Sequence, residues 1–123
     1  MIPVGPSASA CQWLAEATDS VGAQTTPPAL VILVDDMHTG HAGDCVLPRL
    51  ALPRVTNLWR LGVGGSFSVG VAWAHMAHPY ALMLGADDWL EPTAIADAVR
   101  TINVRPRSRG YYWYRVRYAD GRG

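Results

Sequence analysis

Two short apolar segments that each run into a pair of aspartates constrain the fold of this chain more than any other feature. The first segment is Ala29–Val34, followed by Asp35–Asp36, and the second is Ala81–Leu84, followed after two small residues by Asp87–Asp88. A continuous apolar run of this length is typical of a parallel strand that is buried on both faces. Glu91–Pro92 then opens a helix, because proline is tolerated in the first helical turn. We therefore predict that each aspartate pair lies at the carboxyl end of a strand.

The position of these carboxylates favours a ligand-binding role. In open α/β sheets, ligands bind at the carboxyl ends of the strands. Adjacent carboxylates repel each other unless a cation or strong hydrogen-bond donors hold them, and Mg²⁺ prefers oxygen ligands and often keeps phosphates in its shell. The alternative for Asp87–Asp88 is a solvated turn that caps the next helix. The second pair, Asp35–Asp36, favours the ligand-binding interpretation.

The remaining pattern alternates strands with helices, which predicts parallel, right-handed βαβ units. We expect one domain over residues 1–123, an α/β fold in which a mostly parallel, Rossmann-like sheet forms the middle of a three-layer α/β/α sandwich. The predicted strands are Ile2–Gly5, Ala29–Val34, Arg54–Leu58, Ala81–Leu84 and Tyr111–Tyr118, and the predicted helices are Ala10–Val21, Phe67–Ala77 and Pro92–Ile102.

Composition excludes several classes of protein. Half of the 123 residues are hydrophobic, which argues against disorder, and a formal net charge of zero gives no general reason to bind nucleic acid or membranes. No apolar run approaches membrane-spanning length, and the first residues do not resemble a signal peptide. We therefore expect a cytoplasmic protein whose two cysteines are reduced thiols.

A glycine-rich segment precedes the predicted helix Phe67–Ala77. Gly62 and Gly64 would allow close approach of the backbone to a phosphate, which a helix N-terminus attracts. An ordinary turn is the alternative, since the segment matches neither the dinucleotide-binding fingerprint nor the P-loop.

Taken in order, these motifs resemble the donor-binding half of the family 2 glycosyltransferases, which have the GT-A fold of the nucleotide-diphospho-sugar transferase superfamily. That family typically has a strand ending in proline, a helix ending in Ser-Val/Leu-x-x-Gln-Thr, a Val-Asp-Asp strand end, an Asn-x-Gly segment and an Asp-rich metal motif. The corresponding stretches here are Pro6, Asp19–Thr25, Val34–Asp36, Asn57–Gly70 and Gly85–Pro92, so that the resemblance extends over about residues 2–120.

The resemblance implies a domain that binds a nucleotide-diphospho-sugar, commonly a uridine one, with Mn²⁺ or Mg²⁺ for transfer of the sugar to an acceptor. Asp36 would bind the base, Asp87 would face the ribose or the metal, and Asp88 would coordinate the metal on the diphosphate. The metal would neutralise the leaving nucleoside diphosphate. The donor-binding residues so implied are Pro6, Asp35, Asp36, Gly62, Gly64 and Asp87, and the metal ligands are Asp87 and Asp88.

The sequence also departs from the family pattern. Ala8–Ser9 replaces the usual Tyr-Asn, Met37–Gly40 replaces the common Gly-Ser-Thr-Asp, and Gly85 stands where the fullest metal motif has its first aspartate. The sequence stops where the acceptor half of the family would begin, so no catalytic base is assigned, and we expect the chain alone to be at best a slow transferase unless a second chain supplies that half. The alternative is a non-catalytic, degenerate GT-A module with a structural or protein-interaction role. Donor sugar, acceptor, stereochemistry and oligomeric state stay open.

Overall fold

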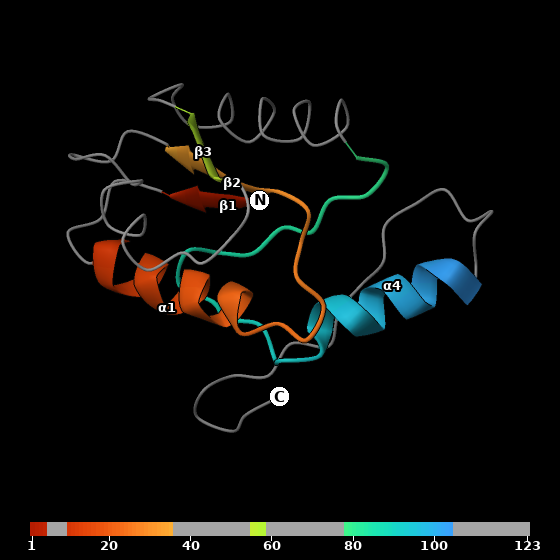
Figure 1. Ribbon diagram of the computed structural model, residues 1–123. Helices are drawn as coiled ribbons and strands as arrows, with labels where there is room; N and C mark the ends of the chain where they lie inside the picture. The colour runs from red at the N-terminus through yellow and green to blue at the C-terminus, as the bar shows by residue number, and fades with distance from the viewer. Residues whose placement is uncertain (5–9, 36–54, 59–77, 105–123) are drawn as a thin grey trace.

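The computed structural model describes residues 1–4, 10–35, 55–58 and 78–104. Three parallel strands, β1 (Ile2–Val4), β2 (Val31–Asp35) and β3 (Val55–Leu58), form a sheet in the order β1-β2-β3. Helices α1 (Ala10–Gly22) and α4 (Ala94–Val104) lie on the same side of this sheet, below it in Figure 1.

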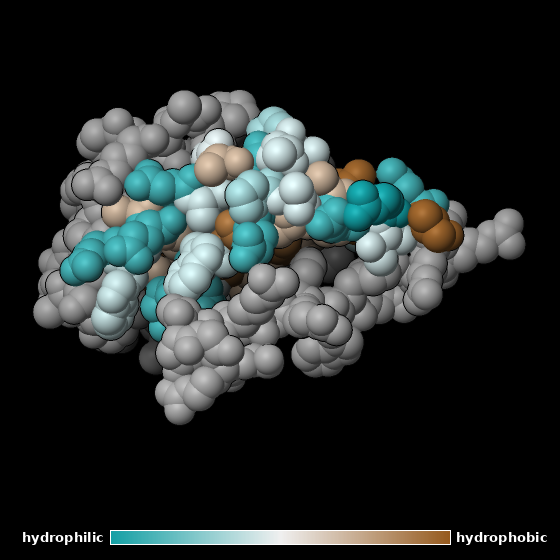
Figure 2. Space-filling view, turned by 90° about the horizontal axis from the view of Figure 1, so that it is seen from below, coloured by the Kyte–Doolittle hydropathy of each residue, from teal (hydrophilic) through white to brown (hydrophobic). Residues whose placement is uncertain are grey.

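Helix α1 packs on the sheet through the apolar stripe that its sequence predicts. Leu14, Ala17 and Val21 are buried and belong to one core cluster with residues of β1 and β2. The opposite side of the helix carries exposed residues such as Gln12 and Glu16. Seen from below, the described residues accordingly give a mainly hydrophilic surface with scattered apolar residues (Figure 2).

Strand β2 is buried on both faces, as predicted. Val31 and Leu33 lie in the cluster that includes residues of α1, whereas Ile32 and Val34 belong to a second cluster. None of the four side chains is more than 3% exposed. Burying a side chain of this size stabilises the fold by about 1.5–3 kcal/mol, so β2 is the centre of the described core.

The apolar segment before the second aspartate pair lies beside β1 but is not a regular strand, in contrast to the prediction. The amino group of Met1 donates to the carbonyl oxygen of Leu82 (2.8 Å), and the Leu84 amide donates to the carbonyl oxygen of Met1 (3.0 Å). These two bonds flank Met83 in the way that a parallel pair of strands does. The segment therefore extends the sheet beyond β1, on the side opposite β2, and its short contact explains why no full strand forms.

The other predicted elements within the described residues are confirmed, with ends that shift by one or two residues. Helix α4 begins at Ala94 rather than Pro92, because residues 92 and 93 form a turn in which the Ala94 amide donates to the Glu91 carbonyl oxygen (2.9 Å). The predicted helix Phe67–Ala77 and strand Tyr111–Tyr118 lie outside the described residues, so the third layer of the sandwich stays a prediction. In the ranges that the structure covers, neither helix has the length and apolar character needed to cross a membrane.

Candidate functional site

The aspartate pair Asp87–Asp88 lies where the order of the sheet reverses. β2 and β3 follow one another on one side of β1, whereas the segment around Met83 lies on the other side. Such a reversal opens a crevice at the carboxyl ends of the strands, which is the usual ligand site of open α/β folds. The chain reaches Asp87–Asp88 directly after this segment, at the same edge as the end of β2, where Asp35 pairs with Val4. The prediction that both aspartate pairs share this edge stays a prediction, because Asp36 lies outside the described residues.

Both carboxylates of this pair lie close to the position that a side chain of residue 85 would occupy. Residues 85–88 form a turn in which the Asp88 amide donates to the Gly85 carbonyl oxygen (3.2 Å). A Cβ atom placed on Gly85 would lie 2.5 Å from Asp88 Oδ2 and 3.1 Å from Asp87 Oδ1. The two carboxylate oxygens therefore converge on the space that glycine leaves free.

This donor set fits a hard divalent cation that also binds a phosphate. Asp87 and Asp88 are exposed, so their oxygens are accessible to a ligand. Among the residues that the structure describes, no three His, Cys, Asp or Glu side chains gather into a potential metal site. Mg²⁺ is typically bound through one or two carboxylates plus substrate phosphates and water, rather than by a cage made of protein alone. Two converging carboxylates match that mode.

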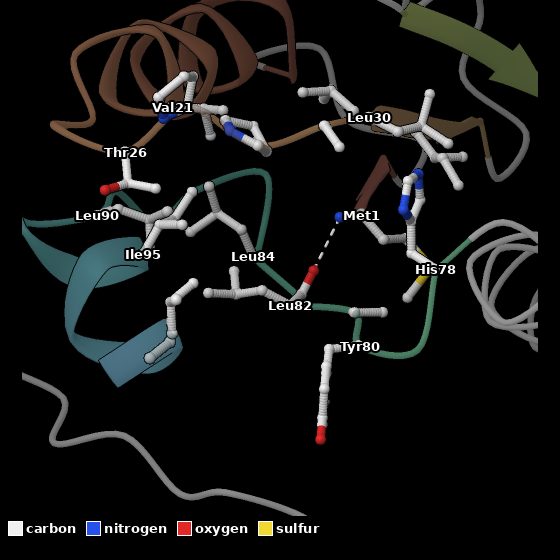
Figure 3. A pocket seen from close by; sticks show the side chains of 18 of the residues that line it. Met1, Val21, Thr26, Leu30, His78, Tyr80, Leu82, Leu84, Leu90 and Ile95 are labelled. Atoms are coloured by element: carbon white, nitrogen blue, oxygen red, sulfur yellow. Dashed lines mark hydrogen bonds between the residues drawn. The ribbon is translucent and has the colours of Figure 1, made fainter. Parts of the chain in front are cut away.

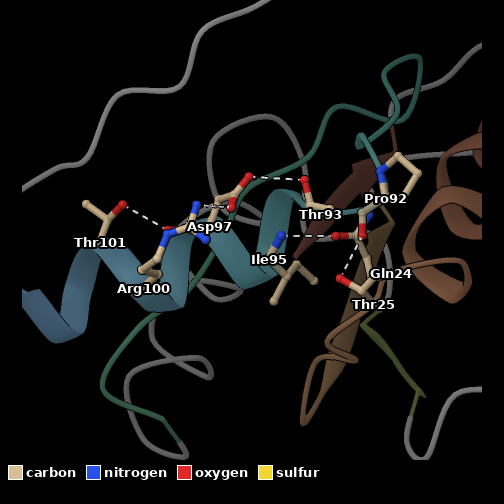
Figure 4. Close-up of polar contacts among 8 residues, drawn as sticks. All are labelled: Gln24, Thr25, Pro92, Thr93, Ile95, Asp97, Arg100 and Thr101. Atoms are coloured by element: carbon tan, nitrogen blue, oxygen red, sulfur yellow. Dashed lines mark hydrogen bonds and ion pairs between the residues drawn. The ribbon is translucent and has the colours of Figure 1, made fainter.

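The backbone after the aspartates is held by the end of α1 (Figure 4). The Leu90 amide donates to Ser20 Oγ (3.0 Å), and the Gln24 side chain bonds both the Glu91 carbonyl oxygen (2.8 Å) and the Ile95 amide (3.0 Å). The Thr25 amide donates to the Pro92 carbonyl oxygen (2.9 Å).

The sequence motif that contains Ser20, Gln24 and Thr25 supported the family resemblance, but sequence reasoning gave these residues no structural role. Their position just before and after a helix end was the available signal, because helix ends leave backbone groups that polar side chains satisfy.

An apolar pocket lies between the sheet and α4 (Figure 3). It has a volume of about 350 Å³ and is lined by side chains such as Leu30, Tyr80, Leu82 and Ile95. Among the described residues, no Asp, Glu, Lys or Arg lines it. The pocket is therefore unsuited to a charged diphosphate, and we place the candidate site at the exposed aspartate turn.

The predicted donor-binding residues fall largely outside the described part of the chain. Pro6, Asp36, Gly62 and Gly64 lie outside the described residues, and for Asp35 only the backbone position is described. Of the predicted donor and metal residues, the structure therefore brings together Asp87 and Asp88, and it adds Gly85 beneath them.

Comparison with known structures supports the α/β fold. The chain is similar to S. aureus TarS 1–349 in complex with UDP, with a TM-score of 0.68 and 21% sequence identity, covering 91% of this chain and 38% of that one. It is also similar to TarS 1–349 in complex with UDP-GlcNAc, with a TM-score of 0.69 and 21% identity, covering 91% of this chain and 36% of that one. No family model and no curated protein matches the sequence. At this identity the likeness shows a shared fold, and the chain spans about 38% of the length of the TarS 1–349 structure.

Proposed function

We propose that this chain binds a nucleotide-diphospho-sugar at the carboxyl edge beside β1, together with Mn²⁺ or Mg²⁺, as the donor-binding part of a glycosyltransferase. The observation that carries the proposal is the convergence of the Asp87 and Asp88 carboxylates over Gly85, at the point where the sheet order reverses. The shared fold with a protein solved with UDP and with UDP-GlcNAc supports the choice of ligand.

Charge explains why a cation belongs to this proposal. Two adjacent carboxylates repel a diphosphate unless a positive charge lies between the carboxylates and the phosphate groups. Asp87 and Asp88 would hold the cation, and Gly85 would leave the space that their oxygens occupy. When bound, the metal would neutralise negative charge on the leaving diphosphate. The residues of this chain therefore bind and orient the donor.

Recognition of the base is assigned on the family resemblance. We propose that the Asp36 carboxylate accepts a hydrogen bond from the ring N–H of uracil. Pro6 and Asp35 would lie along the same edge, after β1 and at the end of β2. Gly62 and Gly64 would allow the backbone to approach the phosphates.

Transfer of the sugar needs groups that are not assigned in this chain. An acceptor hydroxyl requires a positioned base, which is worth about a hundred- to ten-thousand-fold in rate. We propose that these groups belong to an acceptor-binding half, whether in further sequence or in a second chain.

Calorimetric titration with UDP tests the proposal. We expect binding in the presence of Mn²⁺, loss of binding with chelator, and an affinity that Asp88→Asn lowers by about tenfold or more, as loss of metal-site groups commonly does. Glu16→Gln is the matched control, because it removes the same charge from an exposed position on α1. Equal UDP affinity with Mn²⁺ and with chelator would refute the metal role.

Hydrolysis of UDP-GlcNAc separates the enzyme from the non-catalytic alternative. A chain that binds UDP with Mn²⁺ and releases UDP slowly from the sugar nucleotide supports a transferase part. Binding without any release, even in the presence of its genomic neighbours, would favour a binding module.

A further inference from the structure

Gln24 joins the end of α1 to the backbone that follows the aspartate turn. Its Nε2 atom donates to the carbonyl oxygens of Ser20 (3.1 Å) and Glu91 (2.8 Å), and its Oε1 atom accepts from the Ile95 amide (3.0 Å). Figure 4 shows this side chain reaching the start of α4 beside Thr25 and Pro92. One side-chain amide thus links three backbone positions, two of them distant in the sequence.

The chemistry of these contacts requires glutamine. Ser20 supplies one of the unpaired carbonyls at the end of α1, and Ile95 supplies one of the unpaired amides at the start of α4. A primary amide satisfies both, since it carries donors and an acceptor on one planar group. Gln24 is only 7% exposed, so its polar atoms and those of its partners would be costly to leave unpaired.

Two other hydrogen bonds hold the chain on either side of the aspartate turn. Before the turn, the Leu84 amide is bonded to Met1, and after it the Leu90 amide is bonded to Ser20 Oγ. Between these anchors the described hydrogen bonds contain only the bond from Asp88 to Gly85. Within the described part of the chain, the positions of the two carboxylates therefore depend mainly on these anchors.

We propose that Gln24, with Ser20, is a positioning residue that fixes the Asp87–Asp88 turn in the geometry that binds the metal and diphosphate. Gln24 acts through the backbone of residues 90–95 and does not touch the ligand. The part of this proposal that concerns ligand affinity rests on the proposed function, whereas the part that concerns the rigidity of the turn does not.

The test compares Gln24→Met with Gln12→Met, a matched change at an exposed glutamine on the same helix. Amide hydrogen exchange is measured at Asp88 in the turn, at Leu90 two residues after it and at Leu33 in β2. Calorimetry then gives the affinity for UDP in the presence of Mn²⁺. We expect Gln24→Met to speed exchange at Asp88 and Leu90 more than at Leu33, and to weaken Mn²⁺-dependent UDP binding by about tenfold or more.

The control should leave both measurements unchanged. A purely structural role for Gln24 predicts equal acceleration at the turn and at Leu33, and that result would overturn the proposal. An unchanged affinity in a variant whose turn exchanges faster would overturn it as well.

Two further arms keep the result decisive. Should Gln24→Met fail to fold, Ser20→Ala removes the acceptor of the Leu90 amide, together with the bond that Ser20 Oγ donates to the Ala17 carbonyl oxygen within α1, and it is judged by the same two measurements. Should the unmodified chain bind no UDP with Mn²⁺, the proposed function fails, while selective acceleration at Asp88 and Leu90 still supports the positioning of the turn.

Discussion

The missing side chain at Gly85 is the feature that lets both carboxylates of the turn converge. The backbone of Gly85 is not in the left-handed conformation that requires glycine, so the residue is needed there for space rather than for its φ angle. A side chain at this position would collide with Asp88 Oδ2, which lies 2.5 Å from the Cβ position. An aspartate at position 85, as in the fullest form of the family motif, would therefore displace the Asp88 carboxylate from the position that it has here.

Gly85→Ala should therefore weaken metal-dependent UDP binding while changing stability little. The new methyl group would push the Asp88 carboxylate aside, and that side chain is exposed and able to rotate. We expect a loss of about tenfold in affinity by calorimetry with Mn²⁺. Gly22→Ala is the control, because among the described residues no atom beyond its chain neighbours and its own helix backbone lies within 4 Å of its Cβ position.

That control should bind UDP as the unmodified chain does, and it should unfold at the same or a slightly higher temperature, since alanine reduces the freedom of the unfolded chain. If Gly85→Ala also binds normally, the convergence of the carboxylates is not what the ligand needs.

At the residue scale, sequence reasoning located the aspartates but not their support. Asp87 and Asp88 were predictable because carboxylates directly after an apolar segment have a local pattern. The role of Gln24 depends on Glu91, which is 67 positions away in the sequence, and no local pattern reports such a contact.

Strand β2 is the element on which the described core depends. Leu33 is fully buried between α1 and the sheet, at the point where Ile2 of β1 and Asn57 of β3 are its neighbours in register. The strand was predictable from its uninterrupted apolar sequence, because a parallel strand needs apolar residues on both faces.

Leu33→Ala should lower the free energy of unfolding by about 2–5 kcal/mol, through lost burial and a cavity that neighbours cannot fill. Val99→Ala on α4 should change it by less than about 1 kcal/mol, because Val99 is 43% exposed. Urea unfolding followed by circular dichroism measures both. Equal losses would mean that β2 is not the centre of the core.

Helix α4 shows that the sequence of a helix does not determine how deeply its apolar face is buried. Its apolar face, with Ile95, Val99 and Ile102, was predicted from helical spacing, and these residues share one side of the helix along the pocket of Figure 3. None of the helix residues is buried, however. Periodicity identifies an apolar face, but it does not say how completely neighbouring chain covers that face.

For the whole molecule, the alternation of strands and helices was sufficient to predict a parallel α/β sheet. The structure of the segment around Met83 was harder to predict, because its hydrogen bonds to the sheet are the two bonds to Met1 that the structure describes. Its apolar sequence fits a buried strand, while the contact is too short to form one. The first residue of the chain thereby takes part in the sheet.

The stability of the whole molecule should depend on the protonation of Met1. Burial lowers the pKa of its amino group from 8.0 to about 6. The unfolded chain then binds more protons between these values, so the free energy of unfolding should rise as the pH increases from about 6 to 8, by at most about 2–3 kcal/mol. Below about pH 6 this contribution is lost.

Chemical denaturation at several pH values, with free and with acetylated Met1, isolates this effect. An acetylated amide can still donate to Leu82, but it does not titrate, so the difference in stability between the two forms should change between pH 6 and 8. A difference that stays constant with pH would show that the amino group is not buried in solution.

The central claim is that Asp87 and Asp88 hold a divalent cation on a nucleoside diphosphate above Gly85. A crystal of the chain grown with UDP and Mn²⁺ tests it most directly, because the anomalous scattering of manganese locates the ion independently of the protein atoms. We expect one strong peak bonded to carboxylate oxygens of Asp87 or Asp88 and to the diphosphate, at the carboxyl edge beside β1. A manganese peak away from this turn, or UDP bound at this edge with no manganese between it and the aspartates, would contradict it.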